Sequence, residues 1–247
     1  MSPHRQTGEL RIGTSGYEYN HWTDVLYPKG LPKKERFACY AERFDTVEIN
    51  NTFYNLPQEK TFDAWRNRAP GGFRYALKFS RYGTHLKHLK DPEQPIAQFL
   101  DRAERLGAHL GPILVQLPPR WNADPARLDT FLKAAPKRHR WAVELRDRSW
   151  LNDEVFAVLR RHKAALVLHD MIDNHPRELT ADWSYLRFHG THGRYGGGYS
   201  PQALSAWARW IQEQLEAGRD VYVYFNNDVG GHAVRNALDL RRFTSQE

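Results

Sequence analysis

Short apolar runs recur along the chain, and longer segments with helical spacing separate them. Each run is rich in Val, Ile, Leu or aromatic residues and is followed by polar or turn-forming residues, a pattern that predicts β-strands. The eight predicted strands are Leu10–Thr14, Thr46–Asn50, Phe73–Phe79, Ile113–Leu117, Trp141–Leu145, Ala165–His169, Ser184–His189 and Val221–Phe225. Strands that alternate with helices pair in parallel through right-handed crossovers, so the pattern predicts an α/β fold.

The segments between the strands carry apolar stripes typical of amphipathic helices. In the first, Phe37, Tyr40 and Phe44 fall on one helical face. Ser200-Pro201 predicts a helix start, because serine is a good N-cap and proline suits the first helical position. Only the segment between the sixth and seventh strands, around residues 175–180, is too short and polar to predict a helix.

Eight strand–helix units in 247 residues predict closure into a single-domain (β/α)₈ barrel of the TIM type, with parallel strands. The predicted domain covers residues 10–243, after a polar N-terminal tail over residues 1–9. A doubly wound open sheet is the alternative. It usually has fewer units and often an early glycine-rich dinucleotide loop, which this sequence lacks.

Strand alternation assigns polar side chains to the inside of the barrel. The apolar set of each strand must face the helices, which leaves its neighbours facing the lumen. The inward polar set comprises Glu48, Asn50, Lys78, Gln116, Glu144, Arg146, Asp170, Arg187, His189 and Asn226. These residues stand near the C-terminal ends of the strands, where barrel enzymes carry their active sites.

The inward charges balance, with three carboxylates and three cations. Buried charge is costly unless paired, so a salt-bridge network that serves only the fold is one interpretation, and a ligand-binding or catalytic cavity is the other. The predicted catalytic residues are Glu48, Glu144, Asp170 and His189. The predicted ligand-binding residues are Asn50, Tyr54, Lys78, Gln116, Arg146, Trp150, Arg187, Arg194, Tyr195, Asn226 and Asn227. We expect Glu144→Gln and Arg187→Ala to fold and to lose ligand binding.

Glycine-rich segments follow the last two strands and lead into helices. They are residues 190–199 and 227–232. Loops after strands seven and eight are a frequent phosphate site in this fold, because glycines and helix N-termini present backbone N–H groups to an anion. Anion binding and a mobile lid are both open interpretations, and one loop can do both.

Composition and charge limit the cellular location and the partners that we expect. No apolar stretch is long enough to cross a membrane, no secretory signal is visible, and one cysteine, Cys39, excludes an internal disulfide. We therefore expect a cytoplasmic protein without a membrane partner. The net charge of +7 favours anionic partners, nucleic acid among them, although the basic residues are spread along the chain.

Several ordered motifs resemble the YecE-like family, also known as domain of unknown function 72. They are Ile12–Tyr17, Thr46–Tyr54, Ala142–Arg146 with Ser149-Trp150, Arg187–Gly190, and Tyr224–Asn227 with Asn236-Ala237. The resemblance covers residues 10–242 and implies a (β/α)₈-type barrel. Tyr17 stands where many relatives are expected to carry Trp. The resemblance implies no established reaction.

The residues favour an enzyme, with hydrolase or lyase chemistry preferred, that acts on a small anionic or polar ligand without a cofactor or metal. One alternative is a metal-dependent nucleic-acid phosphodiesterase of the DNA-repair type. The suitable ligand types for its metal are His189, Asp170, His169, Glu144 and Glu48. The inward cations would repel a metal. The other alternative is a non-catalytic nucleotide- or nucleic-acid-binding module with aromatic residues at its rim. The sequence predicts no oligomeric state.

Overall fold

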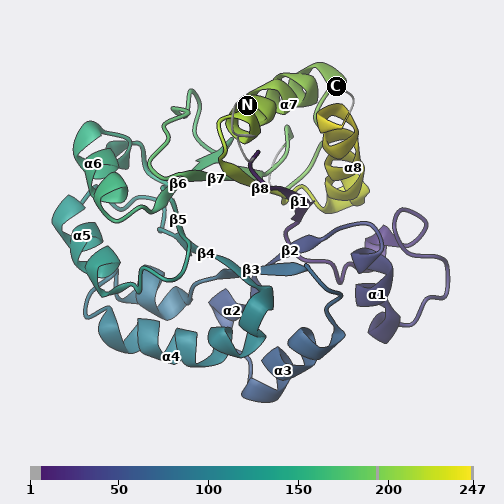
Figure 1. The fold of residues 1–247 in the computed structure, drawn as a ribbon, viewed down its shortest axis with the longest axis horizontal. Helices are drawn as coiled ribbons and strands as arrows, with labels where there is room; N and C mark the ends of the chain where they lie inside the picture. Colours follow the sequence, from purple (N-terminus) through teal and green to yellow (C-terminus); the bar gives the residue numbers. More distant parts are fainter. Residues whose placement is uncertain (1–6, 193–194, 246–247) are drawn as a thin grey trace, which may run out of the picture.

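The computed structural model describes residues 7–192 and 195–245. Eight parallel strands follow one another around a nearly closed barrel (Figure 1). They are β1 (Leu10–Thr14), β2 (Thr46–Ile49), β3 (Arg74–Lys78), β4 (Leu110–Gln116), β5 (Trp141–Glu144), β6 (Ala165–His169), β7 (Trp183–Phe188) and β8 (Asp220–Phe225). The single-domain (β/α)₈ barrel and all eight predicted strands are confirmed, with small shifts of their ends.

Helices surround the barrel (Figure 1). They are α1 (Arg36–Ala41), α2 (Asn51–Tyr54), α3 (Glu59–Arg68), α4 (Glu93–Ala103), α5 (Pro125–Ala134), α6 (Asp153–Arg161), α7 (Pro201–Glu216) and α8 (His232–Thr244). The Ser200 hydroxyl caps α7 by accepting the N–H of Ala203 at 3.2 Å, which confirms that helix start. Residues 170–182, between β6 and β7, form a loop without a helix.

The barrel closes at a seam between β1 and β2. No strand ladder joins these two strands; a bridge between Ser15 and Glu48 connects their ends. A Cβ atom on Gly13 would lie 2.2 Å from the carbonyl oxygen of Thr46, so glycine permits the close approach of the two backbones. The hydroxyl of Tyr40, on α1, spans the gap by accepting the Thr14 N–H at 3.0 Å and donating to Thr46 O at 2.9 Å.

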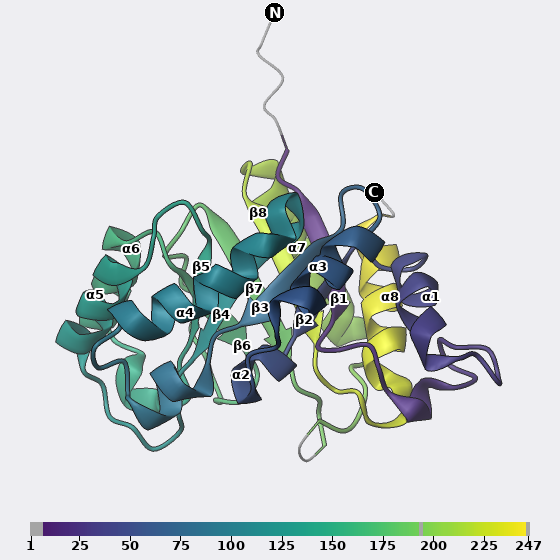
Figure 2. The ribbon, with the colours of Figure 1, turned by 90° about the horizontal axis from the view of Figure 1, so that it is seen from below.

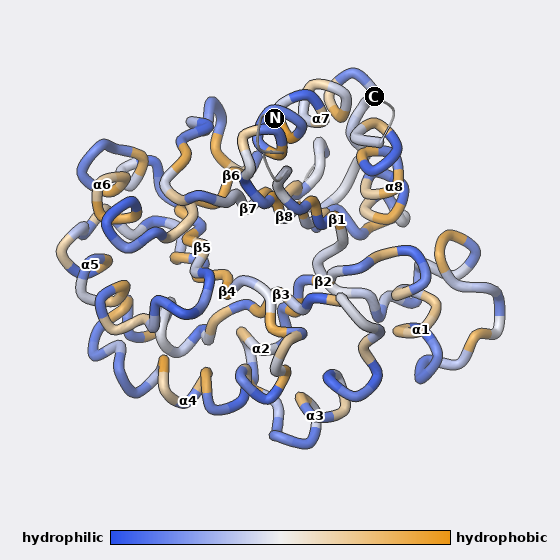
Figure 3. The backbone as a smooth tube through the Cα atoms, viewed as in Figure 1, coloured by the Kyte–Doolittle hydropathy of each residue, from blue (hydrophilic) through white to orange (hydrophobic). Residues whose placement is uncertain are grey.

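Two apolar clusters fill the molecule. The larger lies between the strands and the surrounding helices. Along both kinds of element, hydrophobic and hydrophilic residues alternate (Figure 3). The smaller cluster fills the barrel interior with small and aromatic side chains: Ala76, Leu114, Ala142, Ala165, Val167, Trp183, Tyr185, Tyr222 and Tyr224. The lumen is therefore a packed core, and polar side chains gather above it at the C-terminal end, which we call the mouth.

Different segments of the chain lie at the two ends of the barrel. In the side view of Figure 2, β1 begins at one end of the barrel, and α2, which follows β2, lies at the other. Part of the predicted polar tail is attached to the barrel, since Gly8 N–H donates to Leu215 O and Glu9 N–H donates to the Asp220 carboxylate. Within the described residues, no helix is long and apolar enough to cross a membrane.

Candidate functional site at the mouth of the barrel

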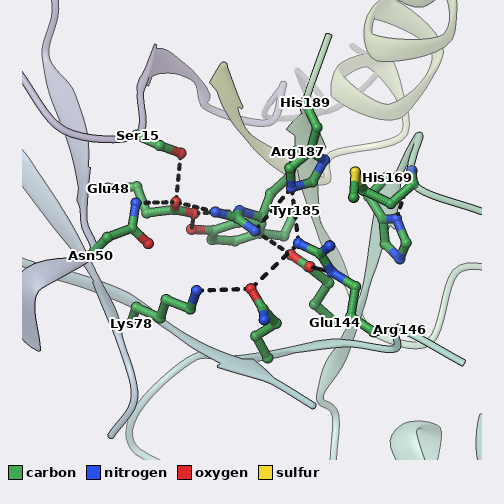
Figure 4. A network of polar contacts seen from close by, with 12 residues as sticks. Ser15, Glu48, Asn50, Lys78, Glu144, Arg146, His169, Tyr185, Arg187 and His189 are labelled. Carbon is green, nitrogen blue, oxygen red and sulfur yellow. Dashed lines mark hydrogen bonds and ion pairs between the residues drawn. The ribbon is translucent and has the colours of Figure 1, made fainter. Parts of the chain in front are cut away.

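A guanidinium at the centre of the mouth joins two carboxylates from distant strands (Figure 4). Arg187, on β7, donates from Nε and Nη2 to the two oxygens of Glu48, on β2, at 2.9 and 2.7 Å. Its Nη1 donates to Glu144 Oε2, on β5, at 2.5 Å. All three side chains are buried. We call this group the central triad.

The central triad holds both carboxylates in the ionised form. Burial alone would raise the pKa of Glu48, but Arg187 and hydrogen bonds from Ser15 and Tyr185 outweigh it and lower that pKa. Burial opposes ionisation of Glu144 as well, yet Arg146 and Arg187 hold its pKa well below the ordinary value. A carboxylate that stays ionised has no proton to give as a general acid. The catalytic roles predicted for both glutamates stay predictions, and the geometry favours a positioning role.

Two further cations, Lys78 and Arg146, converge on the neutral side chain of Gln116. Lys78 Nζ donates to Gln116 Oε1 at 2.8 Å, and Arg146 Nη2 approaches the same oxygen at 3.4 Å. Arg146 also donates from Nε to Glu144. These three predicted ligand-binding residues lie together because β3, β4 and the end of β5 are neighbours in the sheet. The mouth therefore has a cationic wall beside the central triad.

Lys78 is an unusual amine because it is almost fully buried, with 7% of its surface exposed. Its Nζ lies 4.2 Å from the ring centre of Phe53. Burial, followed by repulsion from Arg187, lowers the pKa of Lys78 from 10.5 to about 7. A large fraction of this amine is consequently unprotonated at neutral pH.

His189, Asp170 and Tyr199 form a third group at the rim. His189 Nδ1 lies 3.0 Å from Asp170 Oδ1, and the Tyr199 hydroxyl donates to the other carboxylate oxygen. His189 Nε2 lies 3.2 Å from guanidinium nitrogens of both Arg146 and Arg187. Guanidinium groups only donate, so Nε2 accepts and Nδ1 carries the proton given to Asp170.

The charge state of this rim group follows from its surroundings. Burial lowers the pKa of His189, and Asp170 opposes that effect only in part. Burial would raise the pKa of Asp170, but the hydrogen bonds from His189 and Tyr199 outweigh it and lower that pKa. The result is a neutral imidazole next to an ionised carboxylate, an arrangement suited to accepting a proton at Nε2.

Asn50 sits beside the central triad, and Asn226 ends β8 nearby. Asn50 Nδ2 approaches Glu48 Oε1 at 3.4 Å, whereas its Oδ1 is buried and has no hydrogen-bond partner among the described residues. Asn226 is buried, and its backbone N–H donates to Phe188 O at 2.7 Å. The unpartnered oxygen of Asn50 is an acceptor that a ligand hydroxyl would satisfy.

Other predicted ligand contacts have different surroundings. Tyr54 is 74% exposed on α2, and Trp150 is fully buried with its N–H donated to Trp121 O at 2.6 Å. Asn227 Nδ2 donates to Gly197 O and Asn236 Oδ1, so it connects the glycine-rich loop to α8. Their roles as ligand contacts stay predictions, and the positions of Trp150 and Asn227 favour support of the neighbouring loops.

The glycine-rich loop after β7 folds back on itself. Gly190 N–H donates to the Tyr199 hydroxyl at 2.7 Å, and His192 N–H donates to Gly196 O at 3.1 Å. The ring of Tyr195, a predicted ligand contact, lies 6.2 Å from that of His189. Arg194, also predicted to bind ligand, lies outside the described residues. Anion binding by this loop stays a prediction.

Four side chains of the mouth, those of Ser15, Phe53, Tyr185 and Tyr199, are absent from the predicted set. For Ser15 and Phe53 the sequence contains a usable signal. Ser15 follows β1 directly, as the predicted site residues follow their strands, and its hydroxyl donates to Glu48 at 2.6 Å. Phe53 belongs to the motif Asn51-Thr52-Phe53-Tyr54 after β2 and packs against Lys78. Its neighbour Tyr54 was predicted instead, because sequence alone does not show which aromatic residue of a short helix points inward.

The histidine side chains that could bind a metal, those of His169 and His189, form hydrogen bonds with other groups. His169 Nε2 lies 2.8 Å from Leu145 O, and its Nδ1 accepts the Met171 N–H at 3.1 Å. Across residues 7–192 and 195–245, no three His, Cys, Asp or Glu side chains are grouped as metal ligands would be. The arrangement of His189 between two guanidinium groups and Asp170 differs from that of a metal ligand.

Comparisons with known proteins agree on one family. The family model described as "Protein of unknown function DUF72" matches residues 11–247. The UPF0759 protein YunF of Bacillus subtilis is 23% identical, over 94% of this chain and 93% of its own length. The UPF0759 protein YecE of Escherichia coli is 31% identical over 56% of this chain and 48% of its own length. The crystal structure of a DUF72 family protein from Thermotoga maritima is 27% identical, with a TM-score of 0.86 over 96% of this chain and 100% of that one.

Proposed function

The chain belongs to the DUF72 family of proteins of unknown function, and we propose that it is an enzyme that binds a small anionic substrate at the mouth of its barrel. The proposal rests mainly on the two cations that converge on Gln116. Lys78 and Arg146 share that neutral oxygen, while the carboxylates of Glu48 and Glu144 are already engaged by Arg187. A phosphate or carboxylate beside this pair would be held by charge-assisted hydrogen bonds.

The charge count of the inner mouth supports an anionic ligand. Glu48 and Glu144 oppose Arg146, Arg187 and Lys78, which leaves one positive charge in excess whenever Lys78 is protonated. Asp170 balances the count over the whole mouth, but its oxygens accept from His189 and Tyr199. An anion bound next to Lys78 and Arg146 would neutralise the excess.

His189 is the candidate acid–base group of the proposed enzyme. Its Nε2 points toward the same guanidinium groups that would hold the anion, and Asp170 fixes its tautomer. Once the bound anion accepts the guanidinium N–H groups in place of Nε2, this imidazole can take a proton from the substrate and return it, as hydrolase and lyase reactions require. The central triad would keep Arg146 and Arg187 in position.

Anion binding is tested with the wild-type protein and two arginine variants. Titration calorimetry with inorganic phosphate and with pyruvate should give saturable binding that weakens about tenfold or more in Arg146→Ala, the loss expected for one charge-assisted contact. Arg148→Ala is the matched control, since Arg148 lies on the same loop but is exposed. Equal affinity in both variants would contradict the proposed ligand position.

A second experiment separates an enzyme from a binding module. The protein is incubated with a panel of phosphorylated and carboxylated metabolites, nucleotides and short oligonucleotides, and product formation is followed by mass spectrometry. Turnover by the wild type that His189→Gln lacks would support the proposed enzyme. Binding without turnover would favour a non-catalytic module, and tight oligonucleotide binding that is independent of Arg146 would favour a nucleic-acid partner.

A further inference from the structure

We propose that Lys78 is a nucleophile that forms an iminium with the carbonyl carbon of an aldehyde or ketone that also carries an anionic group. This inference rests on the proposed function, because it assigns a substrate class to the same mouth. It goes further by giving the amine a covalent role in place of a purely electrostatic one.

The position of the amine suits such a role. Lys78 is the last residue of β3, and its side chain points into the mouth (Figure 4). Its Nζ lies 2.8 Å from Gln116 Oε1 and 4.2 Å from the ring centre of Phe53. Its Nζ donates to the neutral oxygen of Gln116, whereas Glu48 and Glu144 bond to arginines. An amine without a direct carboxylate partner can release its proton at lower cost than one held in an ion pair.

Neighbouring cations and burial prepare the amine for attack. Arg187 and Arg146 repel a charge on Nζ, and the protein around Lys78 removes it from water, so its pKa falls from 10.5 to about 7. Desolvation and adjacent cations are the two routes by which proteins make lysine nucleophilic near neutral pH. A lysine that served only to attract an anion would gain nothing from a weakened charge.

The proposed step balances without a further reactant. The lone pair of Nζ attacks the carbonyl carbon, and the carbonyl oxygen takes up a proton to give a carbinolamine. Loss of that oxygen as water then forms the C=N bond of the iminium. Overall, a protonated amine and a carbonyl give an iminium and water, so the positive charge that faces Glu48 and Glu144 is retained. His189 would supply and recover the proton that the leaving hydroxyl needs.

Two other groups suit the rest of such a substrate. Arg146 would hold its carboxylate or phosphate within reach of Gln116 and His189. The unpartnered Oδ1 of Asn50 would accept a hydrogen bond from a hydroxyl group. The substrate class is therefore a small oxo acid or a phosphorylated hydroxyaldehyde, and the experiment below distinguishes the two.

The test is reductive trapping in the wild-type protein. The protein is incubated at pH 7 with pyruvate, glyoxylate or glyceraldehyde 3-phosphate together with sodium cyanoborohydride, and modified lysines are located by peptide mass spectrometry. We expect Lys78 to be modified roughly tenfold or more faster than exposed lysines such as Lys60 and Lys133, because far more of its amine is unprotonated. Acetone, which carries no anionic group, is the control carbonyl.

The outcomes separate this inference from the proposed function. Preferential labelling of Lys78 that falls in Arg146→Ala, and that phosphate suppresses, would support both. Lys78 labelled no faster than Lys60 by all three probes would overturn the iminium role, even if calorimetry showed phosphate bound through Arg146. Labelling by acetone equal to that by pyruvate would overturn the assignment of an anionic carbonyl substrate. Because the decisive measurement uses the wild type, it does not depend on a variant that folds.

Discussion

The burial of Lys78 makes the free energy of unfolding depend on pH. In the unfolded chain its pKa is near the ordinary 10.5, and in the folded protein it is about 7. Between these two pH values the folded state binds fewer protons than the unfolded state. The free energy of unfolding must therefore rise with pH across this interval, since alkaline conditions remove the cost of a buried charge.

We predict that the unfolding free energy of the wild type, relative to Lys78→Met, rises by up to about 1.4 kcal/mol for each pH unit between pH 7 and 10. Urea denaturation of both proteins at pH 6, 7, 8 and 9 measures this difference, and the contributions of unrelated groups cancel. Lys133→Met, on the exposed side of α5, is the control and should show no such slope. A flat difference for Lys78→Met would mean that its amine stays protonated in the folded state.

The seam between β1 and β2 depends partly on a side chain. A bridge at the C-terminal end, where Gly16 N–H donates to Glu48 O at 2.7 Å, joins the two backbones, and below it the Tyr40 hydroxyl, from α1, bonds to Thr14 N and Thr46 O. Gly13 leaves room for the two strands to meet closely. The seam matters for the site because Ser15 and Glu48 stand at its C-terminal end and bond to each other.

We predict that Tyr40→Phe lowers the free energy of unfolding by about 2 kcal/mol, because it leaves a buried N–H and a buried carbonyl without this partner. The aromatic packing is kept, so the loss measures the hydroxyl alone. Chemical denaturation of the variant gives the value. Tyr82→Phe, which removes an exposed hydroxyl, is the matched control and should change stability little. Equal stability of the two variants would show that other bonds close the seam.

The strands and the inward polar residues could be predicted because both depend on local alternation. A residue such as Glu144 or Lys78 has apolar neighbours on either side in the chain, and burial of those neighbours fixes the direction of its side chain. The alternation of β8 likewise directs Tyr222 and Tyr224 inward, because Val221, Val223 and Phe225 face the helices, and both tyrosines form part of the inner core.

Residues beyond the strand ends could not be predicted in this way. Tyr54 and Trp150 stand in short helical turns, where the path of the backbone decides the side chain's direction. One is exposed and the other fully buried. The sequence also gave no means of measuring distances across the barrel. Alternation identified Glu48, Glu144 and Arg187 as inward residues, but only the curvature of the sheet shows that one guanidinium reaches both carboxylates.

At the scale of the whole molecule, the central triad links parts of the barrel that the sheet does not join directly. Glu48, Arg187 and Glu144 belong to β2, β7 and β5, and no two of these strands are neighbours in the sheet. Each carboxylate has its pKa lowered, so the triad contributes stability at neutral pH that is lost as the pH falls into the acidic range. The structure thus changes the expectation for Arg187→Ala, since its removal would leave the buried Glu48 without a cationic partner and Glu144 with Arg146 alone.

We predict that Arg187→Met lowers the free energy of unfolding by about 3–5 kcal/mol, the cost typical of breaking a buried ion pair by removing one partner. The triple variant Glu48→Gln, Glu144→Gln, Arg187→Met should recover part of that loss, because the three triad positions are then neutral and of similar size, although Arg146 loses its carboxylate partner. Denaturation at pH 7 measures both changes. A triple variant as unstable as Arg187→Met would mean that the triad's hydrogen-bond geometry, and not the neutralisation of buried charge, holds the strands around the mouth together. In either case the cations of the mouth depend on it, because Arg146 is oriented by Glu144 and His189 contacts Arg187.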